Sequence, residues 1–168
     1  KKCGHMEGKI IEPVERAAER IRAAVAGRSS PDFKIIARTD ARAPLGMEEA
    51  MHRLKVYKEA GADILFMDAI ESPEEMKRQV GELPGPHMVN MSETGKTPLM
   101  SADELEALGY KIVIFPSSMT RIMVRQLSQF MGMLRETGDS RSWLDRMASL
   151  DETNAALGLP ELDNVSAK

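Results

Sequence analysis

The chain has 168 residues, of which 42% are hydrophobic and 29% are charged, and its formal net charge is -3. This composition is typical of a folded globular domain and argues against a disordered or fibrous protein. Basic and acidic residues are mixed without a basic stripe, which argues against nucleic-acid binding, and no apolar stretch is long enough to cross a membrane.

The chain has one cysteine, Cys3, which cannot form a disulfide within the chain. A free thiol fits a reducing compartment. The first residues also carry no apolar signal-peptide core. We therefore expect a cytoplasmic protein without nucleic-acid or membrane partners.

The first half of the chain reads as helix, strand and helix. Apolar residues recur at helical spacing over residues 13–27 and predict an amphipathic helix. The apolar and β-branched run at 33–37 predicts a buried strand, which runs into Arg38, Thr39 and Asp40. Apolar residues at helical spacing over 47–57 predict the next helix.

The same alternation then recurs. The further strands are predicted at residues 64–67, 87–90 and 111–115. Two of the helices between them begin with a serine followed by a glutamate three residues later, Ser72 with Glu75 and Ser101 with Glu104. This spacing predicts capping boxes, in which each side chain satisfies a backbone N–H of the first turn. A long amphipathic helix follows the last strand.

Strands that alternate with helices predict a parallel sheet, because a parallel return needs a helical crossover. The sheet could be doubly wound or half of an eight-stranded barrel. No glycine-rich phosphate motif follows a strand, and polar residues end every strand, which favours the barrel. These residues are Asp40, Asp68, Asn90 and Ser117 or Ser118.

We therefore predict an α/β fold, the C-terminal half of a (β/α)8 TIM-type barrel, with about four βα units and C-terminal helices. The predicted divisions are a loop at 1–12, the half-barrel at 13–136 and a helical tail at 137–168. Because a full barrel needs about 250 residues, we expect its N-terminal half outside this chain. The apolar residues of the tail would pack against the barrel or, as we favour, against a neighbouring subunit.

The opening residues, Lys1-Lys2-Cys3-Gly4-His5, resemble the signature loop of the isocitrate lyase and phosphoenolpyruvate mutase superfamily. The later strand ends are similar to those of the family and follow in the same order. They are Ala37–Asp40, Leu65–Ala69, Asn90–Pro98 and Phe115–Ser118. The resemblance covers essentially the whole chain and makes 1–12 an active-site loop.

The resemblance implies an enzyme in which Mg²⁺, with Mn²⁺ as an alternative, holds a 2-oxo acid or its enolate. The metal ligands of the family are acidic residues on earlier strands, so we expect no metal ligand in this chain. The family also implies a homotetramer whose subunits exchange the last barrel helix, here Met119–Glu136.

The resemblance also assigns roles to residues. Cys3 is the expected general acid and base, and the cations at Lys1, Lys2 and His5 would hold its thiol near the ionised form. Arg38 offers a planar fork that suits a carboxylate. The expected catalytic residues are Cys3 and His5, and the expected substrate-binding residues are Lys2, Gly4, Arg38, Asp68, Asn90, Thr97, Ser117 and Ser118.

Each residue also has a simpler interpretation. A lone cysteine is more often a small buried hydrophobe than a catalytic thiol. Arg38 could be an ion-pair partner of Asp40, and Asp68 and Asn90 could cap the loops that follow them.

Our first functional hypothesis is a Mg²⁺-dependent lyase that cleaves a C–C bond of a small branched hydroxy di- or tricarboxylate. The products would be a 2-oxo acid and a carboxylic acid. Family lyases specific for isocitrate or methylisocitrate usually have glutamate at the position of Asp68, so a dimethylmalate or another substituted malate is favoured.

Two alternatives remain. The chain could belong to a phosphonomutase, 2-oxo acid hydrolase or decarboxylase of the same superfamily, although Cys3-Gly4 argues against phosphorus chemistry. It could also be an inactive half-barrel fragment that needs its N-terminal half.

Overall fold

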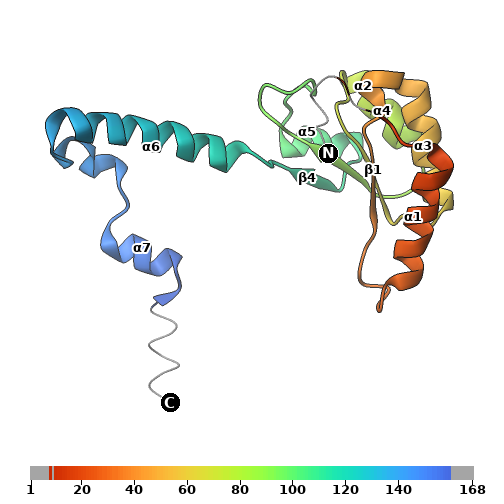
Figure 1. Ribbon diagram of the computed structural model, residues 1–168, viewed down its shortest axis with the longest axis horizontal. Coiled ribbons are helices and arrows are strands. Elements are labelled where there is room, and N and C mark those ends of the chain that lie inside the picture. Colours follow the sequence, from red (N-terminus) through yellow and green to blue (C-terminus); the bar gives the residue numbers. More distant parts are fainter. Residues whose placement is uncertain (1–7, 9, 160–168) are drawn as a thin grey trace, which may run out of the picture. The chain divides into compact units, whose positions relative to one another are not determined.

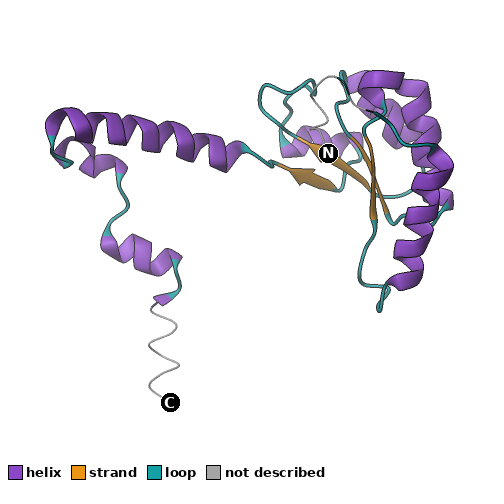
Figure 2. Ribbon diagram, viewed as in Figure 1, coloured by secondary structure: helices purple, strands orange, loops and turns teal. Residues whose placement is uncertain are grey.

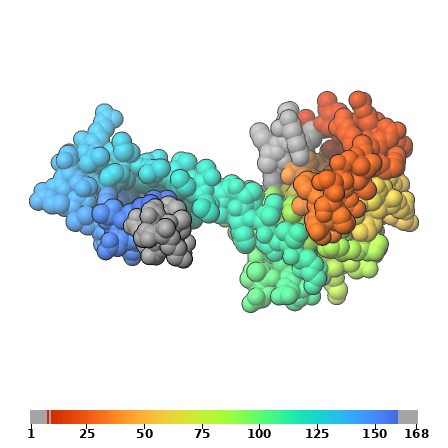
Figure 3. Space-filling model, turned by 90° about the horizontal axis from the view of Figure 1, so that it is seen from below, coloured from red at the N-terminus to blue at the C-terminus, as the bar shows by residue number. Residues whose placement is uncertain are grey.

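The computed structural model describes Gly8 and residues 10–159. The chain forms two compact units, Lys1–Met119 and Thr120–Lys168, which we describe separately. The first unit is a closely packed body in the space-filling view (Figure 3). None of the described helices is both long enough and apolar enough to span a membrane.

The first unit is built on a four-stranded parallel sheet in the order β1-β2-β3-β4 (Figure 1). Its strands are β1 (Ile36–Thr39), β2 (Ile64–Met67), β3 (His87–Asn90) and β4 (Ile112–Ile114). The register places Thr39 beside Met67, and Asn90 beside Ile114. The carboxyl ends of the strands therefore lie along one edge of the sheet, and the predicted parallel sheet is confirmed.

The first strand begins later than the sequence suggests. Its predicted start, Phe33, belongs instead to a turn in which the Phe33 amide donates to the carbonyl of Ser30 at 3.2 Å. The carboxylate of Asp63 accepts from the amide of Ile35 at 2.8 Å. These contacts hold residues 30–35 outside the strand, and the strand instead extends through Arg38 and Thr39.

The described residues of this unit form five complete helices. They are α1 (Val14–Gly27), α2 (Arg42–Leu45), α3 (Met47–Glu59), α4 (Pro73–Glu82) and α5 (Ala102–Leu108). The short α2 is not predicted by the sequence. Contacts between α1 and α3, between α3 and α4 and between α4 and α5 place these four longer helices in a row.

The two faces of the sheet are covered differently (Figure 2). On one face, buried helix residues such as Leu54, Met76 and Leu105 pack with Leu65 and Val89 of the strands. The cluster on the other face contains, among the described residues, only strand residues: Ile64, Phe66 and Met88, with Ile112 and Ile114 beside them. Helices on one face are typical of a barrel wall, whereas a doubly wound sheet carries helices on both.

The helix-covered face contains a buried hydrogen-bonded chain. Tyr110 Oη donates to Gln79 Oε1 at 3.0 Å, and Gln79 Nε2 lies 3.1 Å from His87 Nδ1. His87 Nε2 lies 3.0 Å from the carbonyl oxygen of Leu83. Because a carbonyl only accepts, Nε2 carries the proton and Nδ1 accepts from Gln79. His87 is therefore a neutral residue of the core.

Only one of the two predicted capping boxes is complete. Ser101 and Glu104 close theirs in both directions, with Ser101 N donating to Glu104 Oε2 at 2.7 Å. Ser72 accepts from the amide of Glu75 at 3.2 Å, but the Glu75 carboxylate accepts from the backbone N–H of Glu71 rather than that of Ser72. The box at α4 is thus half formed.

In the part of the second unit that the structure describes, up to residue 159, the regular elements are helices. They comprise most of α6 (Ser118–Thr137), a 3-10 helix η1 (Arg141–Arg146) and α7 (Leu150–Ala156). Phe130 of α6 and Trp143 of η1 meet edge to face with ring centroids 5.5 Å apart. Large apolar side chains of α6 remain more than half exposed: Met119, Ile122, Met123, Val124, Leu127 and Met131.

Candidate active site

The candidate site lies where the strands end. Asp40 directly follows β1, Asp68 directly follows β2, and Asn90 is the last residue of β3. Successive side chains of a strand point to opposite faces, so Arg38 and Asp40 share a face, as do Phe66 and Asp68. This is the face without helices, and the parallel register brings these residues together.

Three of the predicted substrate-binding residues form one hydrogen-bonded chain. Arg38 Nε donates to Asp40 Oδ1 at 2.7 Å, and Arg38 Nη2 donates to Asp68 Oδ2 at 2.7 Å. Asn90 Nδ2 donates to the other oxygen of Asp68 at 3.3 Å. The Asp68 side chain is 1% exposed, whereas that of Arg38 is 31% exposed. The buried carboxylate thus orients a partly exposed arginine and the buried amide of Asn90.

The orientation of Arg38 is further fixed by Phe66. The guanidinium carbon lies 5.1 Å from the centre of the Phe66 ring, within the range of a cation–π contact. Among the described residues, Nη1 of Arg38 makes no hydrogen bond. The end of the guanidinium formed by Nη1 and Nη2 can therefore face an anion with a two-pronged contact.

Asn90 carries an acceptor that the described residues leave unused. Its Oδ1 is buried and has no hydrogen-bond partner among them. The amide orientation follows from Asp68, because an ionised carboxylate accepts only and must face the Nδ2 group. Nδ2 has a second N–H, which makes no hydrogen bond among the described residues. The resemblance implies that this group donates to a substrate carboxylate.

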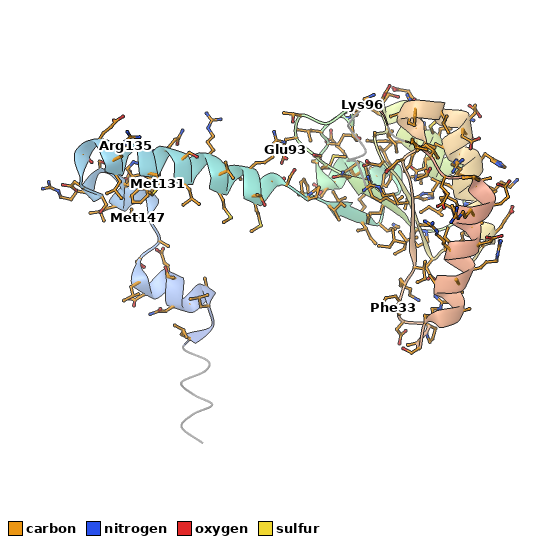
Figure 4. The ribbon with its side chains drawn as sticks, in the orientation of Figure 1. Phe33, Glu93, Lys96, Met131, Arg135 and Met147 are labelled. Carbon is orange, nitrogen blue, oxygen red and sulfur yellow. The ribbon has the colours of Figure 1, made fainter. Side chains whose placement is uncertain are left out.

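The other predicted site residues within the described part of the chain follow β3 and β4. Thr97 is buried within the loop after β3, at 5% exposure, and Ser117 and Ser118 after β4 are half-buried. Ser118 Oγ donates to Glu93 Oε1, which joins this loop to the start of α6. Figure 4 shows Glu93 and Lys96 on the same loop. Sequence reasoning missed Glu93, although a carboxylate three residues beyond Asn90 was a usable signal.

A second missed feature is the backbone after Asp68. Ala69 has φ of 59° and is only 1% exposed, so a buried alanine adopts the left-handed conformation. Such strain is often found at functional sites. Because alanine does not mark this conformation in a sequence, only the structure reveals it.

Four predicted residues, Lys2, Cys3, Gly4 and His5, lie outside the described residues. Within the described part of the chain, no group of three or more histidine, cysteine, aspartate or glutamate side chains could hold a metal ion. The described carboxylates therefore do not assemble a complete set of metal ligands.

Residues 1–135 match the family described as phosphoenolpyruvate phosphomutase. The chain belongs to this family. Its relatives include lyases: 2,3-dimethylmalate lyase of Eubacterium barkeri is 42% identical over 165 residues, which cover 98% of this chain and 57% of that protein. The 2-methylisocitrate lyase of Bacillus subtilis is 36% identical and matches 90% of this chain and 50% of that enzyme.

Solved structures of the phosphoenolpyruvate phosphomutase family share the fold. A crystal structure of 2,3-dimethylmalate lyase, a member of the PEP mutase/isocitrate lyase superfamily, matches with a TM-score of 0.91 and 36% identity over 99% of this chain and 56% of that one. Phosphonopyruvate hydrolase in complex with oxalate and Mg²⁺ matches with a TM-score of 0.80 and 27% identity, over 98% of this chain and 60% of that one. The chain of 168 residues thus spans little more than half the length of these relatives.

Proposed function

We propose that this chain is part of a Mg²⁺-dependent lyase that cleaves a C–C bond of a small branched hydroxy di- or tricarboxylate. The observation that carries the proposal is the chain from Arg38 through Asp68 to Asn90 at the carboxyl edge of the sheet. In parallel barrels this edge is where active sites form. The similarity to 2,3-dimethylmalate lyase and 2-methylisocitrate lyase supports this class of reaction.

The described residues would bind and orient the substrate. The open end of the Arg38 guanidinium would hold one carboxylate in a two-pronged contact, while Asp68 and Phe66 keep the guanidinium in place. The second N–H of Asn90 Nδ2 would donate to another carboxylate oxygen. Thr97, Ser117 and Ser118 would line the remaining wall.

Cleavage would be a retro-aldol reaction. The substrate hydroxyl passes its proton to a general base that the N-terminal half of the barrel would supply, and its oxygen becomes the carbonyl of the 2-oxo acid as the C–C bond breaks. The electron pair moves to the carbon beside the other carboxylate, and that carbon takes a proton from the Cys3 thiol. Because Lys2 and His5 flank this thiol in sequence, they would favour its ionised form after the transfer.

The described carboxylates do not provide a set of metal ligands, so Mg²⁺ would be held by residues of the N-terminal half of the barrel. The complex of phosphonopyruvate hydrolase with oxalate and Mg²⁺ supports a magnesium ion beside a 2-oxo acid in this superfamily. The edge strands β1 and β4 would pair with that N-terminal half, because open parallel edges leave backbone groups without partners.

The proposed substrate is a dimethylmalate or another substituted malate. Asp68 is one methylene shorter than the glutamate usual in lyases specific for isocitrate or methylisocitrate, so Arg38, its partner, would sit differently. A phosphonomutase or a 2-oxo acid hydrolase or decarboxylase of the same superfamily is the second candidate. The similarity to phosphonopyruvate hydrolase supports that alternative.

The test is a substrate panel on the purified enzyme that contains the whole barrel. We expect Mg²⁺-dependent release of a 2-oxo acid from 2,3-dimethylmalate, weaker release from 2-methylisocitrate and none from phosphonopyruvate. Cys3→Ser should lower turnover by about 10²-fold or more, since general acid catalysis contributes about that much. Turnover of phosphonopyruvate alone, or full lyase activity in Cys3→Ser, would contradict the proposal.

A further inference from the structure

A polar network beside the candidate site joins the segments that follow three successive strands, including the starts of α2 and α4. Arg42 follows β1, Glu71 and Glu75 follow β2, and Lys96 lies in the loop between β3 and α5. We call these four residues the clasp. The same segments carry Asp40, Asp68 and Thr97, so the clasp connects the parts of the chain on which the candidate site is built.

The anchor of the clasp is the pair of Arg42 and Glu75. Arg42 Nε donates to Glu75 Oε2 at 2.9 Å, and Arg42 Nη2 donates to Glu75 Oε1 at 2.6 Å. The side chains are only 15% and 21% exposed. A two-pronged, half-buried contact of this kind is strong and fixed in geometry. Glu75 makes it instead of completing the capping box of α4.

The outer arm of the clasp is the pair of Glu71 and Lys96. Glu71 Oε2 accepts from Arg42 at 3.0 Å, and Glu71 Oε1 accepts from Lys96 Nζ at 3.4 Å. The backbone N–H of Glu71 donates to Glu75 Oε2 at 3.1 Å. Glu71 is therefore held in place by the anchor and extends it to the loop after β3.

The outer arm contributes little to the stability of the fold. The side chains of Glu71 and Lys96 are 40% and 44% exposed, and ion pairs so exposed to water contribute little to folding. Other contacts of the loop at 91–101 among the described residues include the amide of Gly95 donating to the carbonyl of Ser92 at 3.0 Å and the amide of Met100 facing Met91 Sδ at 3.4 Å. Ser118 Oγ also donates to Glu93 Oε1. Loss of the pair of Glu71 and Lys96 should therefore loosen this loop without unfolding the unit.

We propose that Glu71 and Lys96 are positioning residues, which hold the loop at 91–101 over the strand ends and so set how tightly the site binds its substrate. The inference deepens the proposed function and rests on it for the nature of the substrate. Neither residue needs to touch the substrate. They act through Asn90, which directly precedes this loop, and Thr97, which follows Lys96 within it.

The first measurement does not depend on activity. Hydrogen exchange of the peptide covering 91–101 is followed by mass spectrometry in the purified enzyme with Lys96→Met, Glu71→Gln or Lys96→Arg. Lys96→Met and Glu71→Gln should speed exchange of this peptide about two- to fivefold, which corresponds to the energy of an exposed pair. Lys96→Arg keeps the cation and should exchange like the parent.

A matched control is Arg78→Met. Arg78 joins α4 to Glu48 of α3 in an exposed ion pair, with Nη2 and Oε2 2.9 Å apart. Arg78→Met removes exposed ion pairs with Glu48 and Glu82, neither of which lies in the loop at 91–101, so exchange of that peptide should stay at the parent rate. Unchanged exchange in Lys96→Met, or an equal increase in Arg78→Met, would overturn the proposal.

The second measurement separates this inference from the proposed function. In the substrate panel, Lys96→Met should raise KM about two- to fivefold and change kcat less, whereas Lys96→Arg should restore KM. If the enzyme cleaves no hydroxy acid, the proposed function fails, and the exchange data still decide whether the clasp holds the loop. Faster exchange with unchanged KM would overturn the positioning role.

Discussion

Arg38 and Asp68 lie 30 positions apart in the sequence, yet Arg38 Nη2 donates to Asp68 Oδ2 at 2.7 Å. The parallel pairing of β1 with β2 brings them together, because Arg38 stands beside Phe66 in the register and Asp68 follows on the same face. The carboxylate is buried and the guanidinium is half-buried. The pair is therefore both a structural contact and the part of the site best placed to bind an anion.

Arg38→Met should destabilise the protein. It leaves the buried Asp68 carboxylate without its arginine donor, which should lower the free energy of unfolding by about 2 kcal/mol. Urea denaturation at neutral pH measures this loss. Arg38→Lys keeps the charge but not the planar fork, so it should lose substrate binding more than stability. Equal stability of Arg38→Met and the parent would contradict the prediction.

Glu75→Gln and Glu104→Gln should differ in stability, although both residues follow a helix-capping serine by three positions. Glu75→Gln loses the charged contact with Arg42 and should cost about 1 to 2 kcal/mol. Glu104→Gln should stay within about 0.5 kcal/mol of the parent, because glutamine can also close a capping box. Urea denaturation compares them, and equal losses would contradict the prediction.

The same contact predicts a dependence on pH. The hydrogen bond from Arg42 lowers the pKa of Glu75 below its usual value. The ionised carboxylate thus stabilises the fold above the pKa of an unfolded glutamate, and this contribution is lost as the pH falls through the lowered value. In acid, the difference in unfolding free energy between the parent and Glu75→Gln should therefore shrink.

His87 should make the protein less stable in mild acid. Burial lowers the pKa of His87, and its Nδ1 accepts a hydrogen bond from Gln79 in the neutral form. As the pH falls below about 6.5, the unfolded chain binds a proton that the folded chain does not, so stability falls. Urea denaturation at several pH values should show this loss in the parent and less of it in His87→Gln.

The exposed histidine His52 on α3 supplies the control. In His52→Gln the buried chain of Tyr110, Gln79 and His87 is unchanged, so the acid-dependent loss of stability should persist. The prediction fails if His87→Gln loses stability below about pH 6.5 as steeply as the parent.

The apolar side chains of α6 predict an interface between subunits. Ile122 and Leu127 are 62% and 56% exposed, and a helix with such a surface needs a partner. Leu127→Glu should therefore reduce the assembly from the proposed tetramer to a smaller species, as measured by native mass spectrometry. Gln126→Glu, on an exposed polar position of the same helix, should leave the mass unchanged. A parent that is monomeric would contradict the prediction.

The sequence by itself determined the alternation of strands and helices and the positions of the polar strand ends. Both depend on local periodicity, which a strand or helix imposes on its own side chains. The strands at 64–67 and 87–90 and the capping box at Ser101 appear as predicted. The shared face of Arg38, Asp68 and Asn90 also follows from the two-residue period once the sheet is parallel.

Only the tertiary structure decided which partners the polar groups take. The Glu75 carboxylate accepts from Arg42, 33 positions away, instead of completing the capping box of α4. The Asp63 carboxylate accepts from the amide of Ile35 and so helps to keep Ile35 out of β1. The positive φ of the buried Ala69 is likewise visible only in the structure. Local pattern fixes which face a side chain occupies, but its partner is chosen by competition among groups that only folding brings within hydrogen-bonding distance.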